Sequence, residues 1–156
     1  MNNTLKLLIA IIVCNLAGII GALFTTSAIS GWYTTLTKPT LNPPGWIFGP
    51  VWTTLYTLMG ISAFLIWKRG IHKKVNQRAL SIFGIQLVLN ATWSIVFFSL
   101  QSPGWALVNI VLMWLAIVWT MVVFYKISKP ATWLLVPYIL WVSFATYLNY
   151  SIWVLN

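Results

Sequence analysis

The sequence predicts an all-α membrane protein, in which five transmembrane helices form a single domain over residues 1–156. Hydrophobic residues make up 60% of the chain, its mean hydropathy is +0.90, and only 6% of its residues are charged. An ordinary soluble domain has about 25% charged residues. A helix needs roughly 20 apolar residues to cross about 30 Å of hydrocarbon. Five stretches are long enough: residues 5–24, 46–67, 79–100, 105–125 and 131–153.

The first stretch is predicted to be a retained helix rather than a cleaved signal peptide. Its apolar run exceeds the roughly 7–15 residues of a signal-peptide core. It also carries small residues, several of them four apart, a spacing that lets helices pack closely in lipid. These residues are Ala10, Cys14, Ala17, Gly18, Gly21 and Ala22. This face would serve either packing within the bundle or a homodimer, and the sequence leaves both open.

The connection that follows, residues 25–45, is predicted to be a long ordered loop. Pro39, Pro43 and Pro44 fix backbone φ and remove amide donors, which makes the segment stiff and non-helical. Because proline is tolerated in the first turn of a helix, Pro43 and Pro44 fit the start of the second helix. Long connections in compact proteins are often functional. A stiff aromatic loop over a helical bundle indicates a lid.

The third helix carries amide and aromatic side chains on one face. Gln86 and Asn90 are four residues apart, and Trp93 and Phe97 continue their face. Amide side chains within a membrane usually face protein or water. From chemistry alone this pattern favours hydrogen bonds between helices over a binding site.

The fifth helix also carries aromatic and amide side chains at helical spacing. Trp141, Ala145 and Asn149 follow at four-residue spacing and share a face. Pro137 lacks an amide donor and leaves the carbonyl of Trp133 free, so we expect it to kink the helix.

The charges are all positive and are distributed unevenly. Nine Lys and Arg residues and no Asp or Glu give a formal net charge of +9. With five spans, one membrane face receives Lys6, Lys68, Arg69, Lys73, Lys74, Arg78, Lys126 and Lys129, and the other receives only Lys38. The positive-inside rule then places the N-terminus in the cytoplasm, and the first loop and the C-terminus outside. Short membrane-flanking clusters of this kind favour contact with lipid headgroups over nucleic acid.

The lack of carboxylate side chains excludes several kinds of chemistry. The chain has no Asp or Glu to act as a general base or to ligate a metal. His72 stands alone in a basic loop and Cys14 stands alone in an apolar helix, so no metal site is predicted. No ionisable Asp, Glu, Lys, Arg or His lies mid-span after Lys6, which argues against proton-coupled transport.

Three segments carry a resemblance to a known family. The first segment is Trp32-Tyr33-x-x-Leu36-x-Lys38-Pro39-x-x-x-Pro43-Pro44-x-Trp46-x-Phe48-x-Pro50-x-Trp52-x-x-Leu55-Tyr56. The second is Gln86-Leu87-x-Leu89-Asn90-x-x-Trp93-x-x-x-Phe97-Phe98. The third is Pro137-Tyr138-x-x-Trp141-x-x-x-Ala145-x-x-Leu148-Asn149-Tyr150-x-x-Trp153. Over nearly its whole length the chain resembles the tryptophan-rich sensory protein/translocator protein family, once called peripheral-type benzodiazepine receptors.

The resemblance implies a ligand pocket between the helices, beneath the first loop. Members of this family are associated with porphyrins, sterols and synthetic benzodiazepine-site ligands. The residues expected to bind the ligand are Tyr33, Lys38, Pro43, Trp46, Gln86, Asn90, Trp93, Phe97, Trp141 and Ala145. Trp46 is expected to face Trp141 and Ala145 across the cavity. Lys38 either meets a porphyrin propionate or anchors at the lipid headgroups.

The leading hypothesis is a receptor-like integral protein of a prokaryotic cell membrane. It would bind porphyrins and related planar hydrophobic molecules, in contact with membrane lipids, for sensing, trafficking or sequestration. Protoporphyrin IX or haem would be a ligand, and no cofactor is required. One alternative is a light-dependent porphyrin-degrading enzyme that uses Trp46 and Trp141; otherwise no catalytic residue is predicted. Another alternative is facilitated transport of lipid-like molecules.

Overall fold

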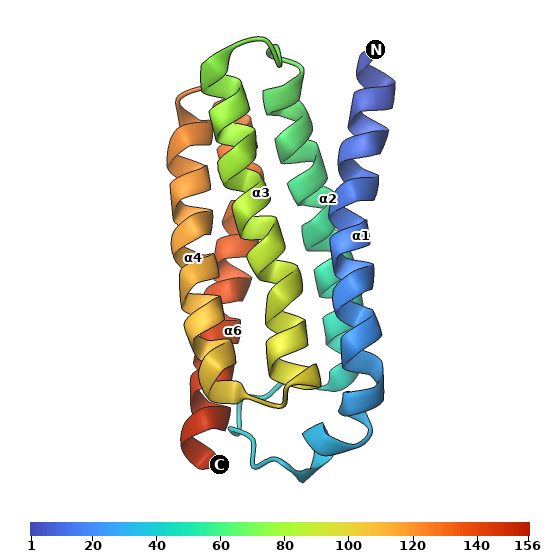
Figure 1. Ribbon diagram of the computed structural model, residues 1–156, viewed down its shortest axis with the longest axis vertical. Helices are drawn as coiled ribbons and strands as arrows, with labels where there is room; N and C mark the ends of the chain where they lie inside the picture. The colour runs from blue at the N-terminus through green and yellow to red at the C-terminus, as the bar shows by residue number, and fades with distance from the viewer.

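The computed structural model describes residues 1–156 and consists of helices, turns and loops without a strand. Five helical segments are long and apolar enough to cross a membrane, as predicted (Figure 1). They are α1 (Asn3–Ile29), α2 (Phe48–Trp67), α3 (Lys74–Ser94), α4 (Pro103–Tyr125), and a fifth made of α5 (Lys129–Leu134) and α6 (Val136–Leu155).

The connection between α1 and α2 is shorter than predicted and partly helical. α1 continues past the predicted end at Phe24 as far as Ile29, and within this extension Thr25 Oγ1 donates to Gly21 O at 2.8 Å. The remaining connection contains one 3-10 turn, η1 (Trp32–Thr35), and a second, η2 (Gly45–Ile47), leads into α2. The expectation of a continuous long loop over residues 25–45 is therefore corrected.

Two of the other spans depart from regular α geometry, α3 at the end that carries the α1–α2 connection and the fifth span in the half that contains the N-terminus. α3 finishes in a π turn, η3 (Ile95–Ser99), in which the amide of Leu100 donates to Ile95 O at 2.9 Å. Turns of this kind are frequent at functional sites. The fifth span is interrupted at Leu135, whose amide donates back to Thr132 O at 3.0 Å, and Pro137 lies in the first turn of α6. The sequence correctly predicted that Pro137 disturbs this helix.

The helices form a closed ring. α1 packs against α2 and α3, α3 packs against α4, α4 against α6, and α2 against α5. In the half of the bundle that contains the N-terminus, the side chains fill the interior. There Phe83 stacks on Phe124 with ring centroids 5.9 Å apart, and Ser62 Oγ donates to Ala131 O at 2.7 Å.

The small residues of α1 pack against other helices of the same bundle. Gly18 lies against the ring of Tyr56, and Ala10 and Ile11 approach Gly60 of α2 so closely that an added Cβ would lie 2.6 Å from Ile11 Cα. Cys14 is buried in the same core. Of the two uses that the sequence left open for this face, the structure shows packing within the bundle.

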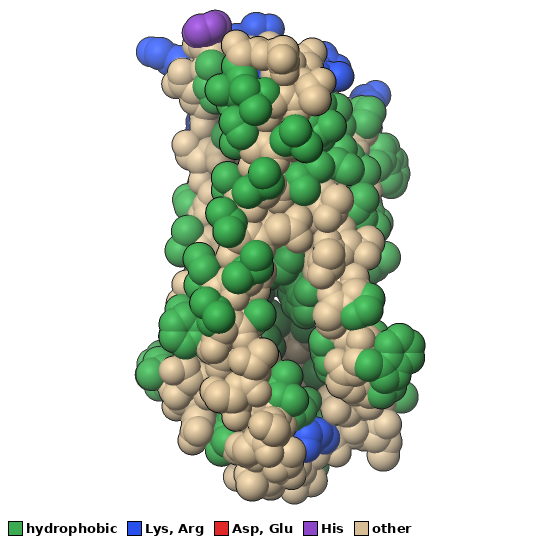
Figure 2. All heavy atoms as spheres, turned by 90° about the vertical axis from the view of Figure 1, so that its right-hand side faces the viewer, with side chains coloured by type: hydrophobic (Ala, Val, Ile, Leu, Met, Phe, Trp, Pro, Cys, Tyr) green, Lys and Arg blue, Asp and Glu red, His purple; other side chains and the backbone are tan.

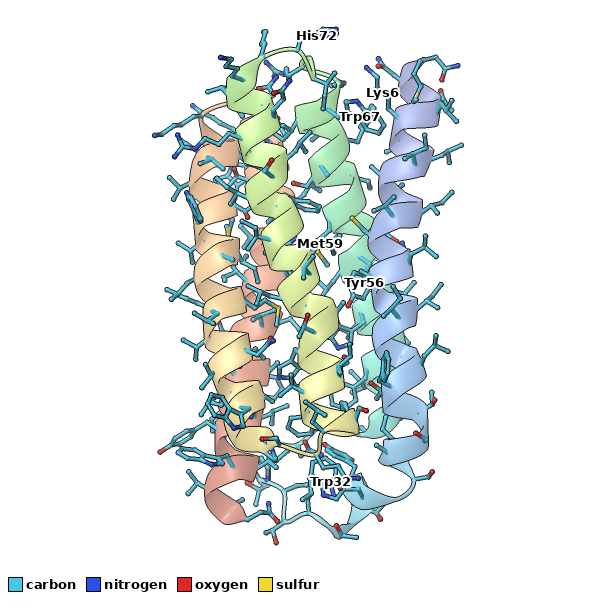
Figure 3. All side chains as sticks on the ribbon, viewed as in Figure 1. Lys6, Trp32, Tyr56, Met59, Trp67 and His72 are labelled. Carbon is cyan, nitrogen blue, oxygen red and sulfur yellow. The ribbon has the colours of Figure 1, made fainter.

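The two ends of the bundle differ in charge. Figure 3 places Lys6, Trp67 and His72 at the end where the chain begins, and Trp32 at the opposite end, where the chain finishes. Figure 2 shows Lys and Arg side chains gathered at the first end. Lys6 Nζ lies 5.9 Å from the centroid of the Trp67 ring. Lys38, in the first connection, is the cation at the other end.

Candidate functional site

A cavity of about 430 Å³ occupies the half of the bundle beneath the α1–α2 connection. The lining residues come from α1, α2, α3, η3, α4 and α6. The α1–α2 connection, which contributes Tyr33 and Asn42 to the lining, covers the cavity and is called the roof below. Most of the lining side chains are apolar. The cavity falls within the roughly 300–1,000 Å³ that is typical of small-molecule sites.

The structure brings six of the ten expected ligand-binding residues to this cavity. They are Tyr33, Asn90, Trp93, Phe97, Trp141 and Ala145. They come from the connection, α3, η3 and α6, so segments distant in the sequence meet around one hollow. The π turn contributes here, since Phe97 and Phe98 lie within it and are both buried.

The aromatic side chains contact one another in two groups. On one side Trp93 stacks on Phe97, with ring centroids 5.1 Å apart and planes inclined by 30°. On the other side the Trp52 ring stacks on Tyr56 at 5.6 Å and meets Trp141 edge-on at 6.5 Å. Such pairs hold the rings in fixed orientations and contribute about 0.5–1.5 kcal/mol beyond the area they bury.

Trp46 does not form a wall of the cavity, which corrects one expectation. It lies in η2, the 3-10 turn that precedes α2, and 75% of its side chain is exposed. Phe48 and Trp52, one turn apart on α2, occupy the place expected for it and contact Trp141. The 3-10 turn explains the difference, because its three-residue period rotates Trp46 away from the face that α2 presents inward.

Three further expected residues lie outside the cavity lining. Pro43 is half-buried in the connection. Lys38 stays on the connection as well, where its Nζ donates to Leu36 O at 3.2 Å and lies 4.6 Å from the centroid of the Tyr33 ring. Gln86 is fully buried one turn below Asn90 on α3.

A chain of buried hydrogen bonds forms the floor of the cavity. The Tyr56 hydroxyl donates to Asn90 Oδ1, and Asn90 Nδ2 donates to the Tyr138 hydroxyl at 2.8 Å. The Tyr138 hydroxyl in turn donates to Gln86 Oε1 at 2.7 Å. The chain joins α2, α3 and α6. Each of its polar groups is paired, as buried polar groups normally must be, and Asn90 keeps one amide hydrogen and one oxygen lone pair for another partner.

Asn149 forms a second set of hydrogen bonds between helices beside the cavity. Trp93 Nε1 donates to Asn149 Oδ1 at 2.9 Å, and Asn149 Nδ2 donates to Pro103 O at 2.8 Å. These bonds connect α3, the first turn of α4, and α6. The four-residue spacing of Trp141, Ala145 and Asn149 thus combines two cavity residues with one residue that hydrogen-bonds the helices together.

The roof is held by polar contacts at two points. The Tyr33 hydroxyl donates to Asn42 Oδ1 at 3.3 Å. Burial raises the pKa of the Tyr33 hydroxyl, and the hydrogen bond to Asn42 opposes part of that change. Asn156, after the end of α6, pairs with the backbone of Thr37: the Thr37 amide donates to Asn156 Oδ1 at 3.0 Å, and Asn156 Nδ2 donates to Thr37 O at 2.9 Å.

Several lining residues were not expected from the sequence. They include Phe48, Trp52 and Tyr56 of α2, Ile110 and Met113 of α4, and the α1 residues from Asn15 to Ile29 that face inward. Trp52 and Tyr56 belong to the first motif, so helical spacing from Phe48 would have identified them. The α1 and α4 residues carry no distinguishing signal, because small and apolar side chains fill all faces of these helices.

The chain is similar to named proteins of bacteria and animals. The tryptophan-rich protein TspO of Chlorobaculum tepidum is 48% identical over 152 residues, which is 97% of this chain and 96% of the relative. The human translocator protein is 40% identical over 86% of this chain and 80% of its own length. The tryptophan-rich sensory protein of Cereibacter sphaeroides is 37% identical over 87% of this chain and 85% of its own length.

A family-wide comparison covers more of the chain than the motifs do. The TspO/MBR family profile matches residues 10–154, which include all five spans except the first turns of α1 and the last residue of α6. The protein is therefore a multi-pass integral membrane protein and belongs to the TspO/MBR family.

Proposed function

We propose that the protein is a receptor-like membrane protein that binds porphyrins and related planar hydrophobic molecules inside the bundle. The observation that supports this most directly is the cavity of about 430 Å³ with the rings of Trp52, Trp93, Phe97 and Trp141 around it. A flat conjugated ligand gains both apolar burial and ring contacts from such walls. The membership of the TspO/MBR family agrees with this proposal.

The polar floor would orient the ligand. Asn90 is 4% exposed and is held by Tyr56 and Tyr138, so its remaining donor has a fixed direction. A few placed polar groups in an otherwise apolar pocket commonly decide how a ligand lies. We expect Asn90 to donate to a nitrogen or oxygen of the ligand, and the aromatic walls to supply most of the affinity.

Lys38 is a candidate for a second polar contact. It lies on the roof beside Tyr33 and outside the cavity, so it would meet only a carboxylate that extends upward from the ligand. Such a contact is solvent-accessible and would contribute no more than about 1 kcal/mol. Lys38→Ala should weaken the binding of a porphyrin with free propionates, whereas it should leave the binding of the propionate ester unchanged.

The proposed function is tested by an equilibrium titration with protoporphyrin IX, followed by porphyrin absorbance in detergent. Trp141→Ala removes one wall and should raise the dissociation constant by roughly tenfold or more, the factor that corresponds to about 1.4 kcal/mol. Trp119→Ala is the matched control, because Trp119 is 47% exposed on α4 and does not line the cavity. Binding that is equally strong in all three proteins, or absent from the unmodified protein, would contradict the proposal.

Light-dependent porphyrin breakdown is a second candidate, favoured by the contact of Trp141 and Trp93 with the cavity. Because Trp46 is mostly exposed, Trp141 rather than Trp46 is the tryptophan of this pair that would react with a photoexcited ligand. Illumination of the porphyrin complex should then give breakdown that Trp141→Phe slows and Trp46→Phe does not. Equal bleaching in both variants would leave only the binding function.

The orientation in the membrane follows from the charge at the two ends. Eight Lys and Arg residues flank the end that holds the N-terminus, and this arrangement favours the cytoplasmic side of a prokaryotic cell membrane. The cavity roof would then face outside. Labelling of Ser30→Cys by a membrane-impermeant maleimide on intact cells tests this orientation, since Cys14 is buried and does not compete.

A further inference from the structure

We propose that the ligand reaches the cavity sideways from the bilayer, through an opening between the parts of α1 and α2 that lie nearest the roof. This inference rests on the proposed binding function and adds to it the route by which the ligand arrives. It also defines the kind of ligand: a molecule whose flat apolar body partitions into lipid before it binds.

The exposed residues of the cavity lining show where the cavity opens. On α1 they are Ile19, Ala22, Thr26 and Ile29; the others are Gly45 of η2 and Gly49 and Thr53 at the start of α2. The lining residues contributed by α3, η3, α4 and α6 are all buried or half-buried. The opening therefore lies between α1 and α2. On the α1 side of the molecule, Figure 2 shows a hollow in the corresponding half of the bundle.

The path of α1 explains why the two helices separate. From its start to just past its middle, α1 contacts α2 closely, at Gly60 and again where Gly18 meets the Tyr56 ring. One turn later its close neighbour is on α3, since a Cβ at Gly21 would lie 3.0 Å from Ser94 Oγ. Towards its end, Ala28 packs in a cluster with Phe97 and Phe98. Along its length α1 therefore packs first against α2 and then against α3, and this change of neighbour leaves a gap between α1 and α2.

Small residues keep the gap open on the α2 side. Gly45 and Gly49 have no side chain, and a Cβ added to either would meet no atom within 4 Å. Both glycines have ordinary negative φ, so their conformation does not require glycine. In a helix glycine is less favourable than alanine by about 0.5–1 kcal/mol, and Gly49 lies in the first turn of α2. At the edge of the cavity, unlike at other positions, the missing side chain of Gly49 leaves the space between α1 and α2 free.

The roof itself offers no comparable route into the cavity, because contacts hold it closed. Asn156 holds the backbone of Thr37 by two hydrogen bonds, and Tyr33 is bonded to Asn42. Trp32 meets the buried Phe97 edge-on, with centroids 5.7 Å apart. A ligand that arrived from water would have to break these contacts, whereas a ligand in the bilayer already faces the opening.

The test measures both rates of protoporphyrin IX exchange in lipid vesicles by stopped flow. Gly49→Phe places a ring in the opening where nothing hinders it, and we expect both association and dissociation to slow by about tenfold or more, as a barrier raised by about 1.4 kcal/mol requires. Ala22→Phe narrows the same opening from the α1 side and should act alike. Val88→Phe adds the same bulk to a lipid-facing position of α3, 66% exposed and outside the cavity, and should leave both rates unchanged.

The dissociation rate separates a blocked route from a damaged site. If the added phenylalanine disturbed the bound ligand instead of blocking its route, dissociation would become faster. Faster dissociation would therefore overturn the proposal. So would a result in which Asn156→Ala accelerates both rates while Gly49→Phe and Ala22→Phe change neither, because the ligand would then pass through the roof. The equilibrium titration of the unmodified protein stands apart from these outcomes: if it shows no binding, the proposed function itself is wrong.

Discussion

The Tyr138 hydroxyl donates a hydrogen bond to Gln86 Oε1 at 2.7 Å and thereby joins α6 to α3 at the base of the cavity. The same oxygen accepts from Asn90 Nδ2 at 2.8 Å, so one phenol serves two amide side chains. Tyr138 and Gln86 are each 1% exposed. No water competes for these bonds, and an amide that lost its partner here would stay unpaired.

We predict that Tyr138→Phe destabilises the protein. The change leaves Gln86 Oε1 and Asn90 Nδ2 without their shared partner, and a buried unpaired group of this kind costs about 1–3 kcal/mol. Unfolding in mixed micelles of increasing dodecyl sulfate content, followed by circular dichroism, should show the loss. Tyr147→Phe is the control, since the Tyr147 ring is 43% exposed and its hydroxyl makes no hydrogen bond to the protein. Equal stability of the two variants would mean that the network contributes nothing.

Two cavity tryptophans should respond differently to the same substitution. Trp93 Nε1 donates to Asn149 Oδ1, whereas Trp141 Nε1 is buried without any hydrogen-bond partner. Trp93→Phe therefore breaks a bond that Trp141→Phe does not, and it should be more destabilising by about 0.5–1.5 kcal/mol. Both rings are half-buried and line the same cavity, so the change in ring size is matched. The same micelle unfolding experiment compares them, and a larger loss for Trp141→Phe would contradict the assignment.

The contact between Asn156 and Thr37 should be visible in hydrogen exchange. The Thr37 amide donates to the Asn156 side chain, so Asn156→Ala removes its acceptor and should speed exchange at that amide. The amide of Leu36 is an internal control, because it donates to Tyr33 O within the neighbouring turn and keeps its partner. Unchanged exchange at Thr37 would show that Asn156 does not hold the roof in solution.

The number and nature of the spans could be predicted from the sequence because lipid leaves few alternatives. Backbone groups in hydrocarbon must be paired within the segment, so long apolar runs have to be helices. Pro137 was equally informative, because a proline in the interior of a long apolar run lacks the amide donor that a continuous helix needs. The end of α1 was missed, since Thr25–Ile29 are less apolar but still continue the helix, in which Thr25 Oγ1 donates to the carbonyl of Gly21.

The candidate site was predictable where side chains follow a regular α-helical period. Asn90, Trp93, Trp141 and Ala145 lie on such helices, and their spacing brought them to the cavity as expected. Trp46 precedes α2 in a 3-10 turn, where that period does not hold. The opening between α1 and α2 had no signal at all, because it depends on where α1 exchanges one neighbouring helix for another.

The close approach of α1 and α2 at Gly60 leads to the last prediction. Alanine should have opposite effects on stability at Gly60 and at a second helical glycine, Gly84. At Gly60 an added Cβ would lie 2.6 Å from Ile11 Cα and 3.0 Å from Ala10 O, and both are backbone atoms that cannot move aside. Gly60→Ala should therefore force the helices apart and cost about 1–3 kcal/mol, the usual penalty for overpacking. At Gly84, within α3, an added Cβ meets nothing within 4 Å. Gly84→Ala should instead stabilise the protein by about 0.5–1 kcal/mol, because alanine loses less backbone entropy in a helix. Micelle unfolding measures both changes, and a Gly60→Ala protein as stable as Gly84→Ala would mean that α1 does not pack on α2 at this point.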